Sequence, residues 1–324
     1  MVTIVPFKDA HLPAAAHLLA ASHRTHRRHT PLLPVAFETA LEALALLDTT
    51  WRWPGAAGFV ALDHDAVVGF LIGLPGHADD DAAHQGYVPA SGYAVRPALA
   101  TTVTAPLFDA LARHWHGLGR HEHHVQLTLA DATVATAWAA LGFEPFLVLA
   151  AAALPLPSPT TPPADVRVRQ ATDDDLETVV QLMRALRQHH AAPPIGLPPP
   201  TAIDDRDHVD QRRMLADPRT GCWLAFLDDR AVGLLTLRPP GTAIAPLHLP
   251  PATIHVVDAV TLAAARGRGV GTVLCAEALG WAHVIGYRHA ALHVHAANRT
   301  AQRFWEARRF VPIAQQRIRR RTDQ

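Results

Sequence analysis

The chain of 324 residues has almost no lysine and very little cysteine. Lys8 is the only lysine, so arginine carries nearly all of the positive charge. Cys222 and Cys275 are the only cysteines, and their wide separation fits neither a disulfide framework nor a zinc-binding pattern. The sequence therefore predicts a protein of a reducing compartment, and we expect it to be cytoplasmic.

Net charge and long apolar runs are missing as well. The 29 basic and 29 acidic residues cancel, which argues against a charge-driven nucleic-acid or membrane-surface binder. No run approaches the ~20 apolar residues of a membrane helix. The N-terminus "MVTIVPFKDAHL" lacks the features of a signal peptide. We expect no nucleic-acid partner, no membrane partner, and a monomer or a homodimer.

A proline-rich stretch, "LPLPSPTTPPAD" at 154–165, divides the chain into halves of similar length. Proline at this density is extended and cannot enter a helix or a sheet core. The chain is also longer than one average domain. We therefore predict a domain at 1–153, a linker at 154–165 and a second domain at 166–324.

The two halves resemble one another. "VTIVPFKDAHLPAAAHLL" aligns with "VRVRQATDDDLETVVQLM" at an offset of 164, and later blocks align at an offset of 167. The aligned pairs include Gly69 with Gly233, Gly119 with Gly286, Trp138 with Trp305, and Phe143 with Phe310. Several ungapped blocks in the same order indicate a duplicated domain.

The second half shows the element order most clearly. Alternating or short apolar runs predict strands at "VRVRQ", "CWLAFL", "AVGLLTLR", "ATIHVVDAVTL", "AALHVHA" and "FVPIAQQRIR". Helical spacing or capping predicts helices after Asp173, in "DHVDQRRMLAD", in "GVGTVLCAEALGWAHVIG" and in "RTAQRFWEARR". The order β-α-α-β-β-β-α-β-α-β indicates an α/β (mixed α+β) domain.

One short stretch, "ARGRGVGTVL" at 265–274, carries the main functional signal. It follows a predicted strand and opens a predicted helix, where free backbone N–H groups and the helix dipole favour an anion. Gly267, Gly269 and Gly271 allow close approach to the backbone, and Arg266 and Arg268 add charge-assisted bonds to phosphate. The alternative interpretation is a tight turn with surface arginines. The spacing fits neither a dinucleotide fingerprint nor a Walker loop.

Arg266 to Gly271 also matches the [QR]-x-x-G-x-[GA] signature of the GNAT superfamily of acetyl-CoA-dependent N-acetyltransferases. Asn298 and the following "TAQRFWEARRF" resemble that family's late motif N-x-x-A-x-x-F-Y-x-x-x-G-F. With the repeat, the chain resembles a tandem GNAT protein, an arrangement similar to that of mycothiol synthases. The resemblance implies two GNAT-like domains, each with a mixed, mostly antiparallel sheet flanked by helices.

The resemblance also implies roles for individual residues. Acetyl-CoA would be the co-substrate, with no metal, and its diphosphate would lie on the amides of Gly267 to Thr272. Its pantetheine arm would pair with the strand near Val260 and Thr261, where a backbone amide would polarise the thioester carbonyl. The full set of cofactor-binding residues would be Val260, Thr261, Arg266, Gly267, Arg268, Gly269, Val270, Gly271, Thr272, Asn298 and Trp305.

The sequence departs from the family pattern at two positions. Trp305 replaces the tyrosine that often protonates the leaving thiolate, and an indole N–H is no useful acid. Trp305 is therefore expected to pack against its surroundings. Arg309 replaces the glycine before the last phenylalanine. An amine nucleophile also needs a base, and Asp258 and His255 on the preceding strand are the candidates.

The first half lacks the glycine turn. The matching stretch "RPALATTVTAP" at 96–106 has Thr102 and Thr104 where the second half has Gly269 and Gly271. We therefore expect this domain to be degenerate for CoA. "HWHGLGRHEHH" within it, from His114 to His124, is interpreted as a solvated helix end in preference to a zinc or nickel site. "RIRRR" at 317–321 is interpreted as an edge strand and solvated end.

The sequence thus predicts an acyl-CoA-dependent N-acyltransferase that transfers an acetyl group to a primary amine on a small molecule or a peptide. The alternative is a non-catalytic acyl-CoA-binding or scaffold protein, which Trp305 favours. A third possibility, a nucleotide-binding enzyme, would require ATP or NAD to compete with CoA.

Overall fold

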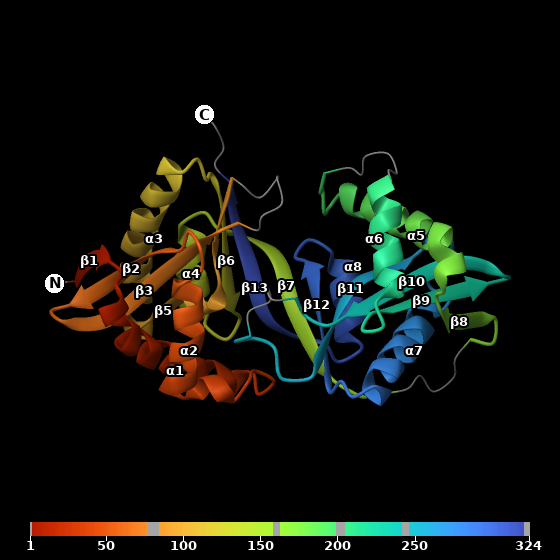
Figure 1. The fold of residues 1–324 in the computed structure, drawn as a ribbon, viewed down its shortest axis with the longest axis horizontal. Coiled ribbons are helices and arrows are strands. Elements are labelled where there is room, and N and C mark those ends of the chain that lie inside the picture. Colours follow the sequence, from red (N-terminus) through yellow and green to blue (C-terminus); the bar gives the residue numbers. More distant parts are fainter. Residues whose placement is uncertain (1, 77–83, 158–162, 199–204, 242–245, 321–324) are drawn as a thin grey trace. The chain divides into compact units, whose positions relative to one another are not determined.

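A computed structural model describes residues 2–76, 84–157, 163–198, 205–241 and 246–320 (Figure 1). The first half contains β1 (Val2–Pro6), α1 (Leu12–His29), α2 (Ala40–Trp51), β2 (Ala57–Asp63), β3 (Ala66–Pro75), β4 (Gln85–Val88), β5 (Tyr93–Val95), α3 (Ala100–Gly117), β6 (Glu122–Thr128), α4 (Ala132–Ala140) and β7 (Glu144–Ala153).

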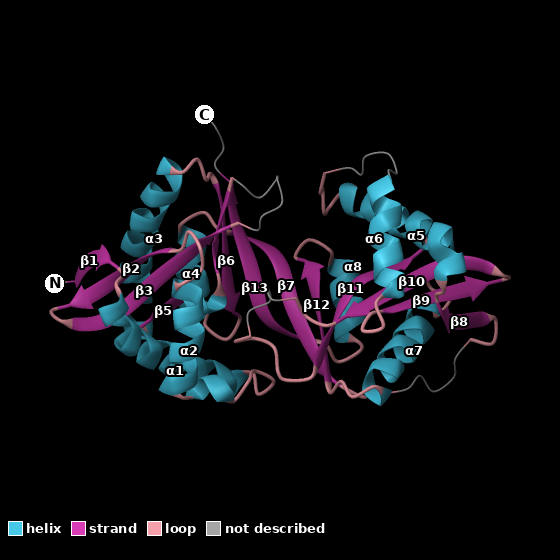
Figure 2. Cartoon of the chain, in the orientation of Figure 1, coloured by secondary structure: helices cyan, strands magenta, loops and turns pink. Residues whose placement is uncertain are grey.

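The second half repeats this order after the linker, except that the single strand β11 stands where the first half has β4 and β5. It contains β8 (Val166–Gln170), α5 (Leu176–Ala191), α6 (Asp205–Ala216), β9 (Gly221–Leu227), β10 (Arg230–Arg238), β11 (Thr253–Thr261), α7 (Val270–Val284), β12 (His289–His295), α8 (Arg299–Glu306) and β13 (Val311–Arg320). The predicted mixed α/β class and the element order are confirmed, and helices flank the strands in each half (Figure 2).

The chain forms two compact units whose membership does not follow the sequence strictly. Unit 1 contains Met1–Leu149, Ile244–Pro250 and Pro312–Gln324, and unit 2 contains Ala150–Ala243 and Pro251–Val311. Two segments of the predicted second domain, Ile244–Pro250 and Pro312–Gln324, belong to unit 1, and residues 150–153 of the predicted first domain belong to unit 2. β13, the last strand of the chain, therefore belongs to unit 1. The predicted domain boundaries stay a prediction.

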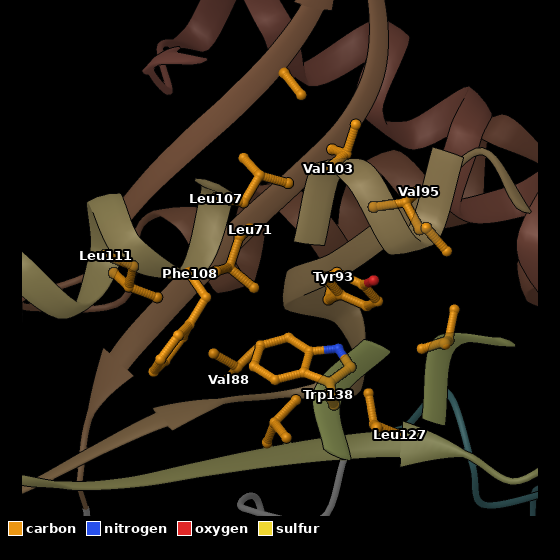
Figure 3. Packing of buried hydrophobic residues seen from close by; sticks show 14 of the residues in the cluster. Leu71, Val88, Tyr93, Val95, Val103, Leu107, Phe108, Leu111, Leu127 and Trp138 are labelled. Carbon is orange, nitrogen blue, oxygen red and sulfur yellow. The ribbon is translucent and has the colours of Figure 1, made fainter. Parts of the chain in front are cut away.

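Unit 1 has a hydrophobic core on each face of its strands. Neighbouring residues of β3 point to opposite faces, so Leu71 joins one core and Phe70 joins the other. In the first core, the indole of Trp138 packs at 5.3 Å from the ring of Tyr93 and 5.6 Å from that of Phe108 (Figure 3). α1 and α2 cover the other core.

In the described part of unit 2, five strands follow the order β12-β11-β10-β9-β8; β11 and β12 are parallel, and the other three neighbouring pairs are antiparallel. α5 packs Val179, Leu182 and Leu186 against Leu224 and Phe226 of β9 in one core. The helix begins after a capping box in which Thr172 and Asp175 exchange hydrogen bonds. These contacts hold β10 and β11, the strands that carry the candidate site, between packed neighbours.

The structure repeats the aligned residue pairs in equivalent surroundings. A β-carbon at Gly69 would meet Val95 and Val103, and one at Gly233 would meet Val260 and Val270. The aromatic pairs also recur: the rings of Trp138 and Phe143 lie 4.9 Å apart, and those of Trp305 and Phe310 lie 5.1 Å apart. The two halves therefore share one fold, as the internal repeat predicts.

The arginine-rich end of the chain differs from the expectation. β13 pairs antiparallel with β6 from Ala314–Thr128 to Arg320–Glu122, and it lies between β6 and β7. The side chain of Arg317 is buried and donates to the carbonyl oxygen of Phe143 at 2.8 and 3.0 Å. Residues 317–320 therefore lie on an interior strand of the sheet and not on an edge strand, whereas the exposed side chains of Arg319 and Arg320 agree with the expected solvated end. Position 321 lies outside the described residues.

Candidate active site

The candidate site begins where β11 separates from β12. Their parallel register runs from Thr253–His289 to Val256–Leu292, although β11 continues to Thr261. On its other side, β11 stays paired with β10 up to Thr261, with a bulge opposite Thr236 and Leu237. The backbone of residues 257–261 is therefore held by β10 on one edge and lies beyond the β12 register on the other.

The glycine turn connects this strand to α7. Gly267 and Gly269 have φ values of +78° and +80°, a region that residues with a β-carbon disfavour. A β-carbon at Gly267 would point into open space, whereas one at Gly269 would come within 2.7 Å of Pro163. One at Gly271 would come within 3.0 Å of Phe304. Each of the three glycines is therefore required for a different structural reason. Of the three, only Gly267 faces open space.

Three arginines surround the turn. Nε of Arg266 donates to the carbonyl oxygen of Thr261 at 3.1 Å. Arg268 forms an ion pair with Asp165, the residue before β8. Arg308 donates to the hydroxyl of Thr272 in the first turn of α7. Arg266, Arg308 and the positive end of the α7 dipole thus bring positive charge to the turn, while Asp165 balances the charge of Arg268.

Asp258 lies on β11 at the bulge. The hydroxyl of Thr236 donates to its carboxylate at 2.8 Å and accepts from its backbone N–H at 3.1 Å. Burial raises the pKa of Asp258 above the usual range, while the Thr236 hydrogen bond and the charges of Arg238, His190 and Arg187 oppose that shift. A carboxylate with a raised pKa is a stronger base than a solvated one.

His255 is the weaker of the two candidate bases. Burial, followed by the charges of His293 and Arg238, lowers the pKa of His255 to about 3. Burial likewise lowers the pKa of His293 to about 4, and the two rings meet edge-on with centroids 5.2 Å apart. An imidazole with so low a pKa accepts a proton poorly near neutral pH. The electrostatics of the site therefore favour Asp258.

The residues of the late motif have structural partners. Oδ1 of Asn298 accepts from the N–H of Ala301 at 3.1 Å and so caps α8. Trp305 is 7% exposed, and its ring packs edge-on against Phe304 and Phe310. Val260 and Val270 are buried beside Gly233. These residues hold the backbone of the site, and the structure gives Trp305 a packing role.

The equivalent region of unit 1 is built differently. α3 begins at Ala100, so Thr102 and Thr104 lie within a helix and not in the expected loop. The hydroxyl of Thr104 donates to the carbonyl of Ala100 at 2.6 Å and bonds the Tyr93 hydroxyl at 2.7 Å. This interior arrangement has no glycine turn of the kind that precedes α7.

Leu247 and His248, which come from far along the sequence, also pack inside unit 1 beside β6. Leu247 is 3% exposed and packs in the core under α1. His248 is fully buried, and its Nε2 lies 2.9 Å from the hydroxyl of Thr128 at the end of β6. A small cavity of about 30 Å³ remains beside Tyr93, Thr128 and Leu247.

The histidine-rich stretch of unit 1 is only partly a solvated helix end. α3 ends at Gly117, but His123 and His124 belong to β6, and His124 is buried against Glu122 at 2.9 Å. His116 and His121 line an open groove of about 640 Å³. Among the residues that the structure describes, no group of three or more metal-ligating side chains comes together.

Sequence comparison finds a known family that is similar to part of the second half. Residues 183–310 match the profile of the Acetyltransferase (GNAT) family. This part of the chain is therefore similar to that family. The matched region includes β9 to β12, the glycine turn and α8. No curated protein matches the chain.

Solved structures extend the likeness of the fold beyond the matched region. A GCN5-related N-acetyltransferase from Sphaerobacter thermophilus has a TM-score of 0.62 at 17% identity, covering 98% of this chain and 95% of that one. The glucosamine N-acetyltransferase region of a fungal multi-domain β-N-acetylglucosaminidase has a TM-score of 0.54 at 13% identity, covering 98% and 38%. Both halves therefore take the fold of GCN5-related N-acetyltransferases. In the described parts of the chain, no helix is long and apolar enough to cross a membrane.

Some neighbours of the site carry no signal in the sequence. Arg308 reaches the glycine turn from beyond the end of α8, and Pro163 and Asp165 reach it from the linker. His190 at the end of α5 lies close enough for Asp258 to affect its pKa, which burial lowers. Only the tertiary fold brings these residues to the turn and to β11.

Proposed function

We propose that the second half transfers an acetyl group from acetyl-CoA to a primary amine. The observation that carries this proposal is the separation of β11 from β12 after Val256, directly before the open glycine turn. The freed backbone at 257–261 offers peptide groups to the pantetheine arm, and Gly267 leaves space for the diphosphate. Gly269 supports the same function less directly, because Pro163 packs over it.

Acetyl-CoA supplies the activated acyl group, and the protein supplies binding, polarity and a base. A backbone N–H of the freed part of β11 donates to the thioester carbonyl oxygen as charge develops there. The acceptor attacks as a neutral amine, its nitrogen bonds the carbonyl carbon, and Asp258 accepts the one proton that the nitrogen loses. The C–S bond breaks and the CoA thiolate takes a proton from water, and the hydroxide that remains takes the proton from Asp258. Trp305 packs against its neighbours and donates no proton.

The first half is proposed to have a structural role. Its helix α3 begins where the second half has the glycine turn, and Leu247 and His248 fill the space beside β6. We infer that unit 1 binds no CoA and that a single acetyl-CoA binds each chain. Titration of the full-length protein with CoA is expected to give a stoichiometry of one, and two equivalent sites would contradict this assignment.

The activity is tested by thiol release from acetyl-CoA in the presence of amino acids, polyamines, aminoglycosides and peptides with free N-termini. At least one amine class is expected to raise thiol release above hydrolysis. Asp258→Asn should lower kcat by about 10²-fold or more, the range of general-base catalysis. Asp217→Asn, at a surface ion pair with Arg219, is the matched control and should leave kcat unchanged.

Two results would contradict the proposal in different ways. Tight CoA binding without turnover of any amine would favour the non-catalytic acyl-CoA-binding protein. Failure to bind CoA at all, in a folded protein, would remove the basis for both functions.

A further inference from the structure

Arg308 combines burial and charge in an unusual way. Its guanidinium stacks over the ring of Phe304 at 3.5 Å from the centroid, and Nη1 donates to the carbonyl oxygen of Phe304 at 2.7 Å. Nη2 donates to the hydroxyl of Thr272. Nε is buried and has no hydrogen-bond partner among the described residues. All the oxygens that Arg308 contacts in this way are neutral.

No carboxylate balances this charge in the part of the chain that the structure describes. Burial lowers the pKa of Arg308, and the only ionisable group that opposes this shift is the thiol of Cys275. Burial also raises the pKa of Cys275 to about 12, so that thiol stays neutral and supplies no negative charge. A half-buried guanidinium without an anion is costly, and an anion close to it would be correspondingly favoured.

The position of Arg308 adds to the excess of positive charge. Thr272 is the third residue of α7, so the guanidinium lies at the positive end of the helix dipole. The Phe304 ring beneath it closes over Gly271, within 3.0 Å of where a β-carbon would stand. Arg308 therefore contacts Thr272 directly, and it contacts Gly271 through the ring of Phe304. The guanidinium of Arg308 and the positive end of the α7 dipole therefore lie together at the glycine turn.

The duplication shows that the fold itself does not need this arrangement. At the offset of 167, Arg308 aligns with Leu141, Phe304 with Ala137, and Thr272 with Ala105. The first half keeps the helices and the Trp–Phe packing but has none of the polar groups. The arginine, its stacking ring and its hydroxyl partner thus accompany the glycine turn and are absent with it.

We propose that Arg308 is a phosphate-binding residue that holds the diphosphate of CoA at the glycine turn. This inference rests on the proposed function, since it assigns a further residue to the same site. Each Nη nitrogen carries two N–H groups and donates one bond to a protein oxygen, so a second N–H remains at each, and the stacked orientation of the guanidinium suits a charge-assisted bond from them to a phosphate oxygen. Arg268 lies on the other side of the turn, where Asp165 pairs with it.

The first experiment measures CoA affinity by calorimetric titration of the full-length protein. Arg308→Gln is expected to weaken CoA binding by about 10- to 100-fold, the range of one lost charge-assisted bond. Arg308→Lys keeps the charge but loses the planar, stacked donor, so it should recover only part of the affinity. Arg303→Gln, at an exposed position on α8, is the matched control and should bind CoA as the wild type does.

The phosphate involved is identified with dephospho-CoA, which lacks the 3′-phosphate. Equal weakening of CoA and dephospho-CoA by Arg308→Gln supports contact with the diphosphate. Weakening of CoA alone would overturn the assignment, because it would place Arg308 at the 3′-phosphate.

A second measurement separates phosphate binding from a purely structural role. Inorganic pyrophosphate should raise the Tm of the wild type and of Arg303→Gln, and it should raise the Tm of Arg308→Gln much less. A structural role would lower the Tm of Arg308→Gln without changing the increment that pyrophosphate produces, and that result would overturn the proposal. Unchanged CoA affinity in a folded Arg308→Gln would overturn it too, whereas failure of the wild type to bind CoA would overturn the proposed function itself.

Discussion

Asp165 and Arg268 form an ion pair across the glycine turn, although 103 residues separate them in the sequence. Both side chains are about half exposed. The carboxylate of Asp165 therefore balances the charge of an arginine that belongs to the glycine turn. Pro163, two residues earlier, packs against Gly269. The linker and the proposed ligand thus compete for one side of the turn.

Asp165→Asn is expected to tighten CoA binding. The substitution frees Arg268 and removes a negative charge that repels the diphosphate. Surface ion pairs contribute about 0–1 kcal/mol, so the gain should be up to about fivefold. Calorimetric titration at low and high salt checks this gain in affinity, because screening should shrink it as ionic strength rises.

Asp229→Asn is the control for this prediction. It breaks the exposed pair with Arg167 in the same unit and should not change CoA affinity. Equal or weaker CoA binding by Asp165→Asn would show that the pair does not compete with the ligand.

Gly267→Ala tests the glycine turn without disturbing the linker. Gly269 is unsuitable, because any β-carbon there would meet Pro163. At Gly267 the added methyl group points into open space, and only the backbone conformation is strained, at a cost of about 1–2 kcal/mol. We expect a modest fall in Tm and at least tenfold weaker CoA binding, measured by thermal denaturation and calorimetry.

Gly119→Ala provides the comparison for this prediction. Gly119 follows α3 in unit 1, has a φ value of +73° and also faces open space. Its substitution should lower Tm to a similar extent and leave CoA affinity unchanged. If Gly267→Ala behaved in the same way, the glycines would serve the turn alone.

The sequence predicted the elements of the fold because local patterns determine them. Two apolar runs around a polar turn identified β9 and β10, and helical spacing identified α7. The Trp–Phe and glycine pairs of the repeat were also visible, since equivalent residues pack in equivalent places. The pairing of β13 with β6 and the burial of Leu247 in unit 1 were not predictable, because such contacts depend on segments that local patterns cannot bring together.

The residues of the candidate site also fall into those that the sequence predicted and those that it did not. The glycine turn and Asp258 could be found in the sequence, because a motif and a strand position mark them. Arg308 and Asp165 could not be found, because each reaches the turn only through the tertiary fold. The electrostatic preference for Asp258 over His255 also required the burial of both side chains.

Asp258→Asn is expected to stabilise the protein at neutral pH while it removes the base. The pKa of Asp258 is raised in the folded state, so folding favours the protonated form. Its contribution to stability is present below the unfolded pKa, about 3.9, and is lost as pH rises through the folded pKa. The Tm difference between Asp258→Asn and the wild type should therefore grow from pH 4 to pH 7.5. A difference that shrinks with rising pH would show that the folded pKa is not raised.

Arg309→Gly is expected to stabilise unit 2. Arg309 has a φ value of +65°, and its repeat partner Gly142 has one of +81°. A side chain in this conformation costs about 1–2 kcal/mol, and the greater backbone freedom of an unfolded glycine offsets about half of that. The free energy of unfolding should rise by up to about 1 kcal/mol in urea denaturation. Arg309→Ala keeps the β-carbon and should give no such gain. A gain from alanine as large as that from glycine would point to the charge of Arg309 and not to its backbone.

Substitutions of Trp305 test whether the proposed reaction needs a side-chain acid. Its ring packs against Phe304 and Phe310, so both Trp305→Tyr and Trp305→Phe should fold with a similar loss of stability from the space left behind. The two variants differ by one hydroxyl. If protonation of the CoA thiolate limits turnover, Trp305→Tyr should have a higher kcat than Trp305→Phe, because the phenol of tyrosine can give up a proton and the phenylalanine ring cannot.

We expect equal kcat values for Trp305→Tyr and Trp305→Phe, since CoA thiolate leaves readily and water can protonate it. Steady-state kinetics at neutral pH, with Tm measured in parallel, makes the comparison. A kcat for Trp305→Tyr that exceeded both Trp305→Phe and the wild type would mean that the missing acid limits the natural enzyme.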